Sequence, residues 1–397
     1  MIILKNATVF NSIETKLFPG STVVIRGDRI EAVGRDVIAP SNADVILDLK
    51  GKTALPGFID AHVHFGGADG FDHPGIGSKQ ETYDYLKSRM DALKWGITTV
   101  RSTGDYMPDI LEFRDEVNLG QHISPRIIAA GKMIQARGGH PVSTVFGGNA
   151  AIAEGACVLV DENTDLDKEV KALADAGVDW IKAFISEVNK LDYPARVPRI
   201  PPEMIKRIVD LAHFCGKPCT IHVDNISHMR EAAMAGADCI EHVFSVGASD
   251  TEIDDDLIEL LIKNRTYIVP TVFSIKAHEN PEGNMPLVYE KLIRQVGKLI
   301  AAGVNIGAGT DSNIPFVTLG ESFHEELSEL VKCGMAPLEA LKAATNGNAK
   351  LLRKDDEIGA ILPGYYADMI VVGGDPIKDI NQTKNIDLVI ANGRIMM

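Results

Sequence analysis

Short apolar runs alternate with segments of helical period between Leu55 and about Leu352, and this alternation most limits the folds open to the chain. Eight runs are rich in β-branched residues. The segments between them carry apolar residues at helical spacing, and several end in a glycine suited to a helix C-terminus. The runs are Leu55–His64, Gly96–Thr103, Pro125–Ile134, Val178–Ile185, Pro218–Asp224, Asp238–Phe244, Thr266–Phe273 and Asn305–Ser312. Eight strand–helix alternations predict an α/β fold, a (β/α)8 TIM barrel, rather than an open sheet.

The two ends of the chain have a different pattern. Residues 1–54 contain short β runs joined by turn signals, with no helical segment between them. Residues 362–397 contain two further β runs and an Asn-Gly hairpin signal. We therefore expect residues 1–54 and 362–397 to pair into one small β-sandwich domain, beside a barrel formed by residues 55–361.

Two histidines lie one residue apart at the end of the first run, in the stretch LPGFIDAHVHFGG. Side chains alternate along a strand, so His62 and His64 share one face while Val63 points to the other. A histidine in a strand is more often a hydrogen-bonded core residue than a metal ligand. The pair alone is a weak indication of a metal site, so support for such a site has to come from ligand-type residues in the other runs.

In a parallel barrel, functional groups lie at the carboxyl ends of the strands. Six residues that can act as metal ligands occupy that end or its immediate surroundings. They are His62, His64, Lys182, His222, His242 and Asp311. An ionisable residue inside an apolar strand is costly unless it is paired, so this many placements are not expected by chance.

Longer motifs around these residues resemble the metal-dependent amidohydrolase superfamily, in the branch with a carboxylated lysine. They are PGFIDAHVH, AGADCIEHVF, GTDS, PLEALKAATNGNAKLL and GAILPGYYADMIVVGGDP. Within the superfamily the chain is most similar to the imidazolonepropionase-related group, which includes prolidase-like and arginine-carboxypeptidase-like enzymes.

The resemblance implies a centre of two divalent metal ions, usually zinc. His62, His64 and Asp311 would hold one ion and His222 and His242 the other, with carboxylated Lys182 and a hydroxide between them. Neutral imidazoles and carboxylates suit zinc. A lysine in a low-dielectric site has a lowered pKa, which leaves a free amine able to take up carbon dioxide. The alternative for Lys182 is an ordinary buried salt bridge.

The implied activity is hydrolysis of a carbon–nitrogen amide bond by a metal-bridging hydroxide. Asp311 would be catalytic, moving the proton from the nucleophile to the departing nitrogen. We expect a dipeptide or an N-acyl amino acid as substrate, and ring opening of a cyclic amide is the alternative. A deaminase fits less well, because the resemblance implies that deaminases of this superfamily have a glutamate at the position of Asn225. A non-enzymatic scaffold barrel would typically lose ligands, and this chain keeps all six.

Two loop residues are candidates for substrate contacts. His140 lies in QARGGHP, which resembles an element of the prolidase-like group whose histidine contacts the substrate. Arg137 would meet a substrate carboxylate, although a solvated loop arginine explains it equally well. Asp60 lies on the same strand face as His62 and His64, one layer deeper in the barrel, and is expected to support these metal ligands. The loops at residues 65–78 and 187–202 are further candidates for the pocket.

Composition excludes several other classes of protein. A net charge of −15 argues against nucleic acid or an anionic membrane as partner. No apolar stretch is long enough for a membrane span, and the N-terminus shows no secretory signal, so a cytoplasmic location is expected. The five cysteines form no C-x-x-C pair, which is typical of reduced thiols. A small-molecule substrate is the expected partner, and a homo-oligomer is left open.

Overall fold

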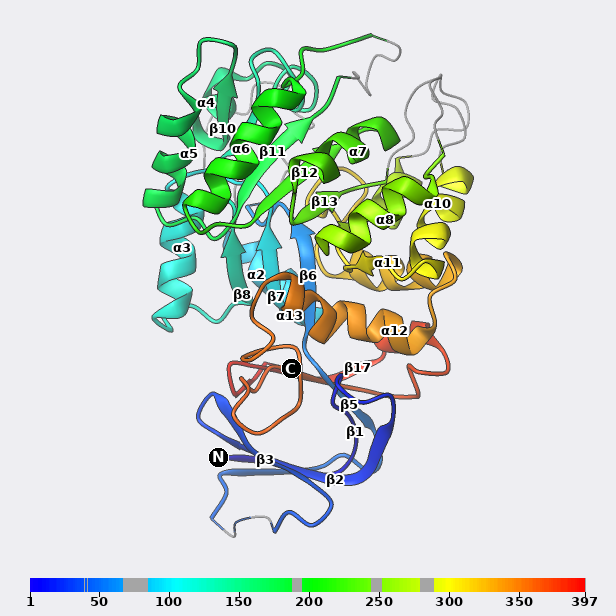
Figure 1. Ribbon diagram of the computed structural model, residues 1–397. Helices are drawn as coiled ribbons and strands as arrows, with labels where there is room; N and C mark the ends of the chain where they lie inside the picture. Colours follow the sequence, from blue (N-terminus) through cyan, green and yellow to red (C-terminus); the bar gives the residue numbers. More distant parts are fainter. Residues whose placement is uncertain are drawn as a thin grey trace.

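The computed structural model describes residues 1–38, 40, 42–66, 85–187, 195–243, 252–278 and 289–396. Parallel strands and their helices form the larger part of the molecule, and strands from both termini form a separate sheet below them (Figure 1). The strands of the terminal sheet are β1 (Ile2–Phe10), β2 (Leu17–Arg26), β3 (Arg29–Gly34), β4 (Val45–Asp48), β5 (Thr53–Pro56), β16 (Met369–Val372), β17 (Ile386–Ala391) and β18 (Arg394–Ile395).

Within the described residues the parallel strands fall into two sheets. The first has the order β6-β7-β8 and the second the order β10-β9-β11-β12-β13-β14-β15. Their bounds are β6 (Phe58–Val63), β7 (Ile97–Ser102), β8 (Arg126–Ala129), β9 (Met133–Ala136), β10 (Cys157–Val160), β11 (Ile181–Ile185), β12 (Cys219–Val223), β13 (Cys239–Glu241), β14 (Tyr267–Val269) and β15 (Asn305–Ile306). Each of the eight predicted runs contains a strand, and the strands are almost entirely buried, as expected for a parallel sheet covered by helices.

Backbone hydrogen bonds connect the two parallel sheets at both edges. On one side Ala61 N donates to Ala308 O at 3.0 Å and His64 N donates to Ser312 O at 3.0 Å, which joins β6 to the chain after β15. On the other side Asp179 N donates to Ala129 O at 2.7 Å, which joins the end of β8 to the chain before β11. The result is an α/β fold of the TIM-barrel type.

The predicted third strand differs from the observed structure. The run Pro125–Ile134 is interrupted at Gly131, whose φ of 66° lies in the left-handed region that favours glycine. Its first half, β8, pairs with β7, and its continuation, β9, pairs with β11 and with β10, a strand that the sequence pattern missed. The interruption therefore lets one run serve both sheets.

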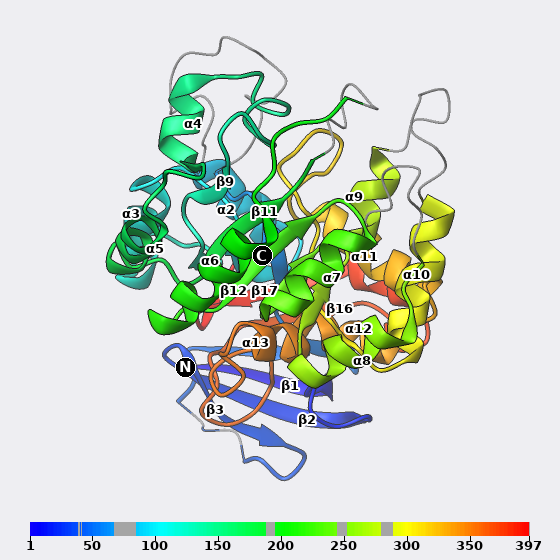
Figure 2. The ribbon, with the colours of Figure 1, turned by 45° about the horizontal axis from the view of Figure 1, so that its top comes forward.

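Helices lie around the outer side of the strands, as the views in Figures 1 and 2 show for α5 to α8 beside β11 and β12. Local signals fix several of their ends: Asp165, Asn225 and Asp254 cap α5, α7 and α8 by accepting backbone N–H groups. The helices are α2 (Tyr85–Lys94), α3 (Asp109–Asn118), α4 (Ala150–Ala156), α5 (Leu166–Asp175), α6 (Pro202–Phe214), α7 (Ile226–Ala235), α8 (Asp255–Asn264), α9 (Val272–Ala277), α10 (Tyr289–Ala301), α11 (Glu321–Lys332), α12 (Pro337–Lys342) and α13 (Asn348–Leu351), with a π-turn at Ala343–Gly347 and a 3-10 turn at Ile380–Lys384.

The two termini share the terminal sheet through direct strand pairing. The strand β16, from the C-terminal part, pairs antiparallel with β5, from the N-terminal part. The predicted Asn-Gly hairpin joins β17 to β18. Strand pairing within the described residues gives one eight-stranded sheet, so its division into the two layers of a sandwich stays a prediction. The sheet has an apolar core of its own, and it also contributes Phe10, Leu55, Ile370, Val372 and Val389 to the main core between strands and helices.

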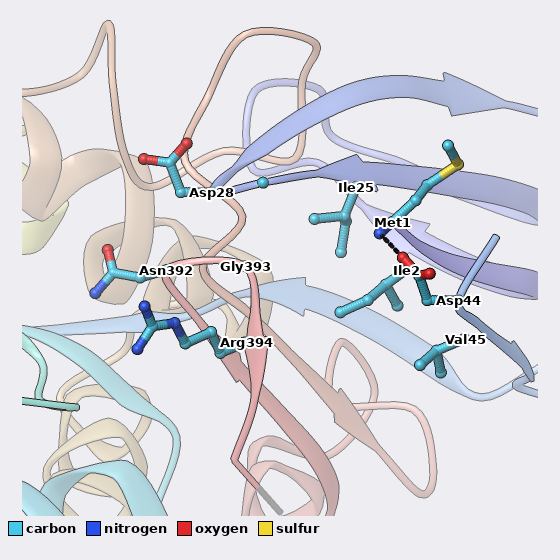
Figure 3. A pocket seen from close by; sticks show the side chains of 10 residues that line it. Met1, Ile2, Ile25, Asp28, Asp44, Val45, Asn392, Gly393 and Arg394 are labelled. Atoms are coloured by element: carbon cyan, nitrogen blue, oxygen red, sulfur yellow. Dashed lines mark hydrogen bonds and ion pairs between the residues drawn. The ribbon is translucent and has the colours of Figure 1, made fainter. Parts of the chain in front are cut away.

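A polar hollow of about 440 Å³ lies in the terminal sheet (Figure 3). The amino group of Met1 binds Asp44 at 2.6 Å on one side, and Asp28 and Arg394 line another part. None of the residues that line it is one of the predicted ligands.

Candidate metal centre

The structure brings His62, His64 and Asp311 together. One candidate ligand atom of each lies within 4.8 Å of those of the other two. The Oδ1 atom of Asp311 is 3.2 Å from Nε2 of His62 and 3.2 Å from Nε2 of His64. Burial opposes the charge of the Asp311 carboxyl. When His62 and His64 are protonated on Nε2, the charge of His62 and the hydrogen bonds of both rings outweigh burial and hold the pKa of Asp311 well below the usual range, and a bound cation would take the place of those protons.

The opposite nitrogen of each of these histidines is already engaged. His62 Nδ1 faces Glu241 Oε2 at 2.7 Å, and His64 Nδ1 faces the carbonyl oxygen of Gly104 at 2.8 Å. A carbonyl oxygen only accepts, and so does an ionised carboxylate, so Nδ1 carries the proton in both rings. In the neutral rings both Nε2 lone pairs then point at a carboxylate oxygen. Three electron-pair donors converging on one point fit a bound cation.

A row of histidine rings continues from this group. The ring centroids of His62 and His242 are 5.0 Å apart, and those of His242 and His222 are 4.6 Å apart. His242 Nδ1 contacts the hydroxyl of Thr271 at 2.7 Å, whereas His222 uses Nε2, which contacts Asp224 at 3.2 Å. The rings of His242 and His222 are thus close enough together to supply imidazole ligands to a second ion.

Burial of His242, together with the charge of His222, holds its pKa well below the usual range. The His242 ring is thus suited to the neutral form that a metal requires.

Lys182 lies inside the strands beside these rings. Its side chain is buried, and Nζ has no hydrogen-bond partner among the described residues. The ammonium lies 5.1 Å from the ring centroid of Phe184, which in turn stacks on His222 at 4.6 Å. Burial lowers the pKa of Lys182 to about 8; the charge of Glu241 opposes this shift and that of Arg101 adds to it. No carboxylate of the described residues binds Nζ directly, which argues against the ordinary salt bridge considered for this lysine.

Strained backbone marks three strand ends at this site. His242, Thr271 and Asp311 follow β13, β14 and β15, and their φ values are 73°, 48° and 58°. Residues with a side chain seldom adopt the left-handed region, and such outliers cluster at functional sites. At His242 the turn has a direct effect, because it lets both Glu241 and His242 reach the interior although neighbouring strand residues normally face opposite ways.

A glycine lets the chain after β15 approach the first histidine closely. A Cβ atom at Gly309 would lie 2.9 Å from the backbone nitrogen of His62. Asp60 reinforces this junction by accepting Thr310 N at 3.1 Å on Oδ1 and the Thr310 hydroxyl at 2.7 Å on Oδ2. Burial raises the pKa of Asp60 to about 7. The carboxyl of Asp60 thus holds the strand ends that carry His62 and Asp311, the supporting position expected for it.

The two predicted substrate residues lie in different surroundings. His140 is buried, and its ring centroid is 5.1 Å from that of His222, with Nδ1 at 2.6 Å from the Thr144 hydroxyl. Arg137 instead binds Asp161 Oδ2 at 3.0 Å beside β10 and lines an open groove of about 730 Å³. The structure thus places His140 beside the histidine row, and it brings Arg137 to Asp161.

Sequence reasoning missed several residues that support the centre. Glu241 and Arg101 form a fully buried ion pair, and Thr220 also donates to Glu241. Asp105 accepts the backbone N–H groups of Phe65 and Gly66, at 3.0 and 2.9 Å, and so fixes the chain just after His64. Burial raises the pKa of Asp105 to about 6.

One signal was available in the sequence for some of them: Arg101, Thr220 and Glu241 are polar residues in otherwise apolar strands. Most of the loop at 65–78 and part of 187–202, which we considered for the pocket, lie outside the described residues.

Comparison with known proteins defines the family. The model of the amidohydrolase family matches residues 53–396. The chain is 26% identical to ochratoxinase from Aspergillus niger, over 82% of this chain and 71% of that protein. It is 25% identical to 5-methylthioadenosine/S-adenosylhomocysteine deaminase from Carboxydothermus hydrogenoformans, over 100% of this chain and 92% of that protein. A crystal structure of a Xaa-Pro dipeptidase with bound methionine in the active site superposes with a TM-score of 0.80 at 27% identity, covering 100% of this chain and 99% of that chain.

The chain therefore belongs to the amidohydrolase family, and it is a hydrolase that acts on carbon–nitrogen bonds. The family generally uses divalent metal ions, and the His62, His64 and Asp311 group supplies a matching set of ligands. Among the described helices, none combines the length and the apolar character needed to cross a bilayer.

Proposed function

We propose that the protein hydrolyses an amide bond of a dipeptide or an N-acyl amino acid, with two divalent ions, most suitably zinc, at this centre. His62, His64 and Asp311 would hold one ion, and His222 and His242 the other. The observation that carries the proposal is the meeting of the Nε2 atoms of His62 and His64 with Asp311 Oδ1, at 3.2 Å each. Bound divalent ions would lower the pKa of water toward about 7 and polarise the substrate carbonyl.

Lys182 would bridge the ions as a carbamate. Its amine is buried, has no hydrogen-bond partner among the described residues, and has a pKa lowered to about 8 by burial. A large fraction of the amine is therefore neutral near pH 8 and can add to carbon dioxide, losing one proton and gaining a negative charge. That charge would balance cations in an interior where an unmatched ion is costly.

Asp311 is the group best placed to move the proton. Its Oδ1 atom lies at the meeting point of the ligands, and its side chain is 14% exposed, so one edge faces the open end of the strands. It would take a proton from the attacking water and deliver it to the departing nitrogen. His140, beside His222, would contact the substrate.

The family and one similar structure support the proposed substrate class. The similar Xaa-Pro dipeptidase acts on a dipeptide and holds methionine in its active site. The ions and Asp311 would serve a cyclic amide equally well, so ring opening remains the competing outcome. Deamination is not proposed, because Asn225, at the position of the deaminase glutamate, is used to cap α7 through His228 N at 2.9 Å.

The test is amine release from dipeptides, N-acyl amino acids and lactams by the zinc-loaded protein. We expect turnover of linear amides, and Asp311→Asn should lose at least ~100-fold in kcat, the usual contribution of general acid–base catalysis. Asp375→Asn, a partly exposed aspartate that binds Lys378, is the matched control and should keep full activity. Turnover of lactams alone would replace the linear substrate by the ring, and full activity of the Asp311 variant would contradict the proposed proton transfer.

A further inference from the structure

The fully buried ion pair between Arg101 and Glu241 contacts His62, the first of the predicted ligands. Arg101 Nη2 on β7 donates to Glu241 Oε1 on β13 at 2.6 Å, and neither side chain is exposed. The guanidinium also lies 4.6 Å from the ring centroid of Trp180, and its Nε donates to the carbonyl oxygen of Ala61 at 2.5 Å. One arginine thus holds both the carboxylate of Glu241 and the backbone next to His62.

The two oxygens of Glu241 have separate partners. Oε1 accepts from Arg101 and from the Thr220 hydroxyl, whereas Oε2 faces His62 Nδ1 at 2.7 Å. An arginine is always a donor, and a carboxylate paired with it acts as an acceptor. The imidazole therefore has to donate from Nδ1, which leaves Nε2, on the side of Asp311, as the nitrogen that a metal ion can take.

We propose that Glu241, held by Arg101, is the positioning residue that fixes the metal-binding tautomer of His62. This inference rests on the proposed metal centre. In solution a neutral imidazole exchanges between two tautomers, and only the Nδ1–H form offers Nε2 to an ion. By holding that form and the ring orientation before metal arrives, Glu241 and Arg101 raise the affinity of the site. Glu241 itself is not a ligand in this assignment.

Glu241→Gln tests the proposal with a side chain of nearly equal shape. Its single amide oxygen is claimed by Arg101 and Thr220, so its NH2 group would face His62 Nδ1 and favour the opposite tautomer, with the proton on Nε2. Cobalt(II) titration of the metal-free variant, followed by visible absorption, should give an affinity about 10- to 100-fold below that of the wild type. Nitrogen-15 NMR of labelled histidine should show the His62 proton on Nδ1 in the wild type and on Nε2 in the variant.

Asp368→Asn is the matched control. Asp368 is also a buried carboxylate paired with an arginine, Arg126 at 2.9 Å, but it lies next to the terminal sheet and contacts none of the predicted ligands. Its variant should bind cobalt(II) as the wild type does. Equal cobalt affinity and an unchanged tautomer in Glu241→Gln would overturn the inference.

The tautomer of His62 in the wild-type protein distinguishes failure of this inference from failure of the proposed metal centre. The tautomer is measured on the metal-free protein, so a His62 ring without a proton on Nδ1 would overturn the inference even if Glu241→Gln failed to fold. If the wild-type protein bound no cobalt(II), the proposed metal centre would fail, whereas a proton on Nδ1 that moves in the variant would still support the orienting contact.

Discussion

At the scale of single residues, each histidine ring of the site is oriented by a different neighbour. His62 contacts the Glu241 carboxylate, His64 the Gly104 carbonyl, His242 the Thr271 hydroxyl and His222 the Asp224 carboxylate. Asp224 lies two residues after His222, whereas the partners of His62, His64 and His242 come from distant parts of the chain. The arrangement of lone pairs is therefore a property of the folded strands.

Lys182→Met tests the proposed carbamate at this scale. Methionine keeps an unbranched apolar stem but lacks the amine, so it can pack in the same space without taking up carbon dioxide. After exchange with carbon-13 bicarbonate we expect a carbamate carbon resonance in the metal-loaded wild type and its loss in Lys182→Met. Lys132→Met, a variant of a lysine that donates to Glu154 O near the surface, should keep the signal. A carbamate resonance that persists in Lys182→Met would assign it to another amine.

The sequence identified ligands more easily than their supports. His62 and His64 share a face because of strand alternation, and Asp311 follows the last strand, so pattern alone places them at one end of the barrel. The role of Glu241 could not be predicted in this way, because strand alternation would place Glu241 and the adjacent His242 on opposite faces. The left-handed φ of 73° at His242 resolves this, and no local pattern predicts it.

At the scale of elements, the loops and helices that follow the strands hold the ligands in place. The predicted strand Thr266–Phe273 ends early as β14, because Thr271 turns and α9 begins at Val272. Glu326 on α11 accepts the N–H groups of Val272 at 3.1 Å and Phe273 at 2.7 Å, which anchors the start of α9 beside Thr271. A long-range contact of this kind is set by helix packing, which a single sequence does not reveal.

The stability contributed by Glu326 should depend on pH. Burial raises its pKa from 4.5 to about 8, with a smaller contribution from the charge of Glu329. The folded protein then holds a proton that the unfolded chain releases, so the free energy of unfolding falls as pH rises from 4.5 to about 8. The slope attributable to this group is at most about 1.4 kcal/mol per pH unit.

Glu326→Gln isolates this effect, because it keeps an acceptor oxygen and cannot titrate. Urea denaturation between pH 5 and pH 8 should show the wild type losing stability relative to the variant as pH rises. Glu339→Gln, which changes an exposed glutamate on α12, should follow the wild type. Parallel curves for wild type and Glu326→Gln would show that the carboxyl of Glu326 is ionised throughout that range.

At the scale of the whole molecule, both termini are fixed to the start of the parallel strands. Arg126, at the beginning of β8, binds Asp368 at 2.9 Å, and its guanidinium lies 3.4 Å from the ring centroid of Tyr366. Arg29, from β3, lies 3.4 Å from the same ring. One aromatic ring and one ion pair thus add to the apolar contacts that hold the terminal sheet to the larger part of the molecule.

Tyr366→Ala should therefore lower stability without changing the chemistry. Removing the ring takes away two cation–π contacts, and we expect the free energy of unfolding to fall by about 1–3 kcal/mol. Tyr366→Phe keeps the ring and should remain close to the wild type in thermal denaturation. A loss of stability as large in the phenylalanine variant would assign the effect to the hydroxyl and contradict the stacking account.

The number of divalent ions bound per chain tests the central claim most directly. Protein freed of metal, reloaded with zinc and passed through a desalting column would be measured by inductively coupled plasma mass spectrometry, beside His62→Asn and His242→Asn variants. The account predicts two ions per wild-type chain and fewer in each variant. Two ions retained in both variants, or none in the wild type, would contradict a metal centre built on these histidines.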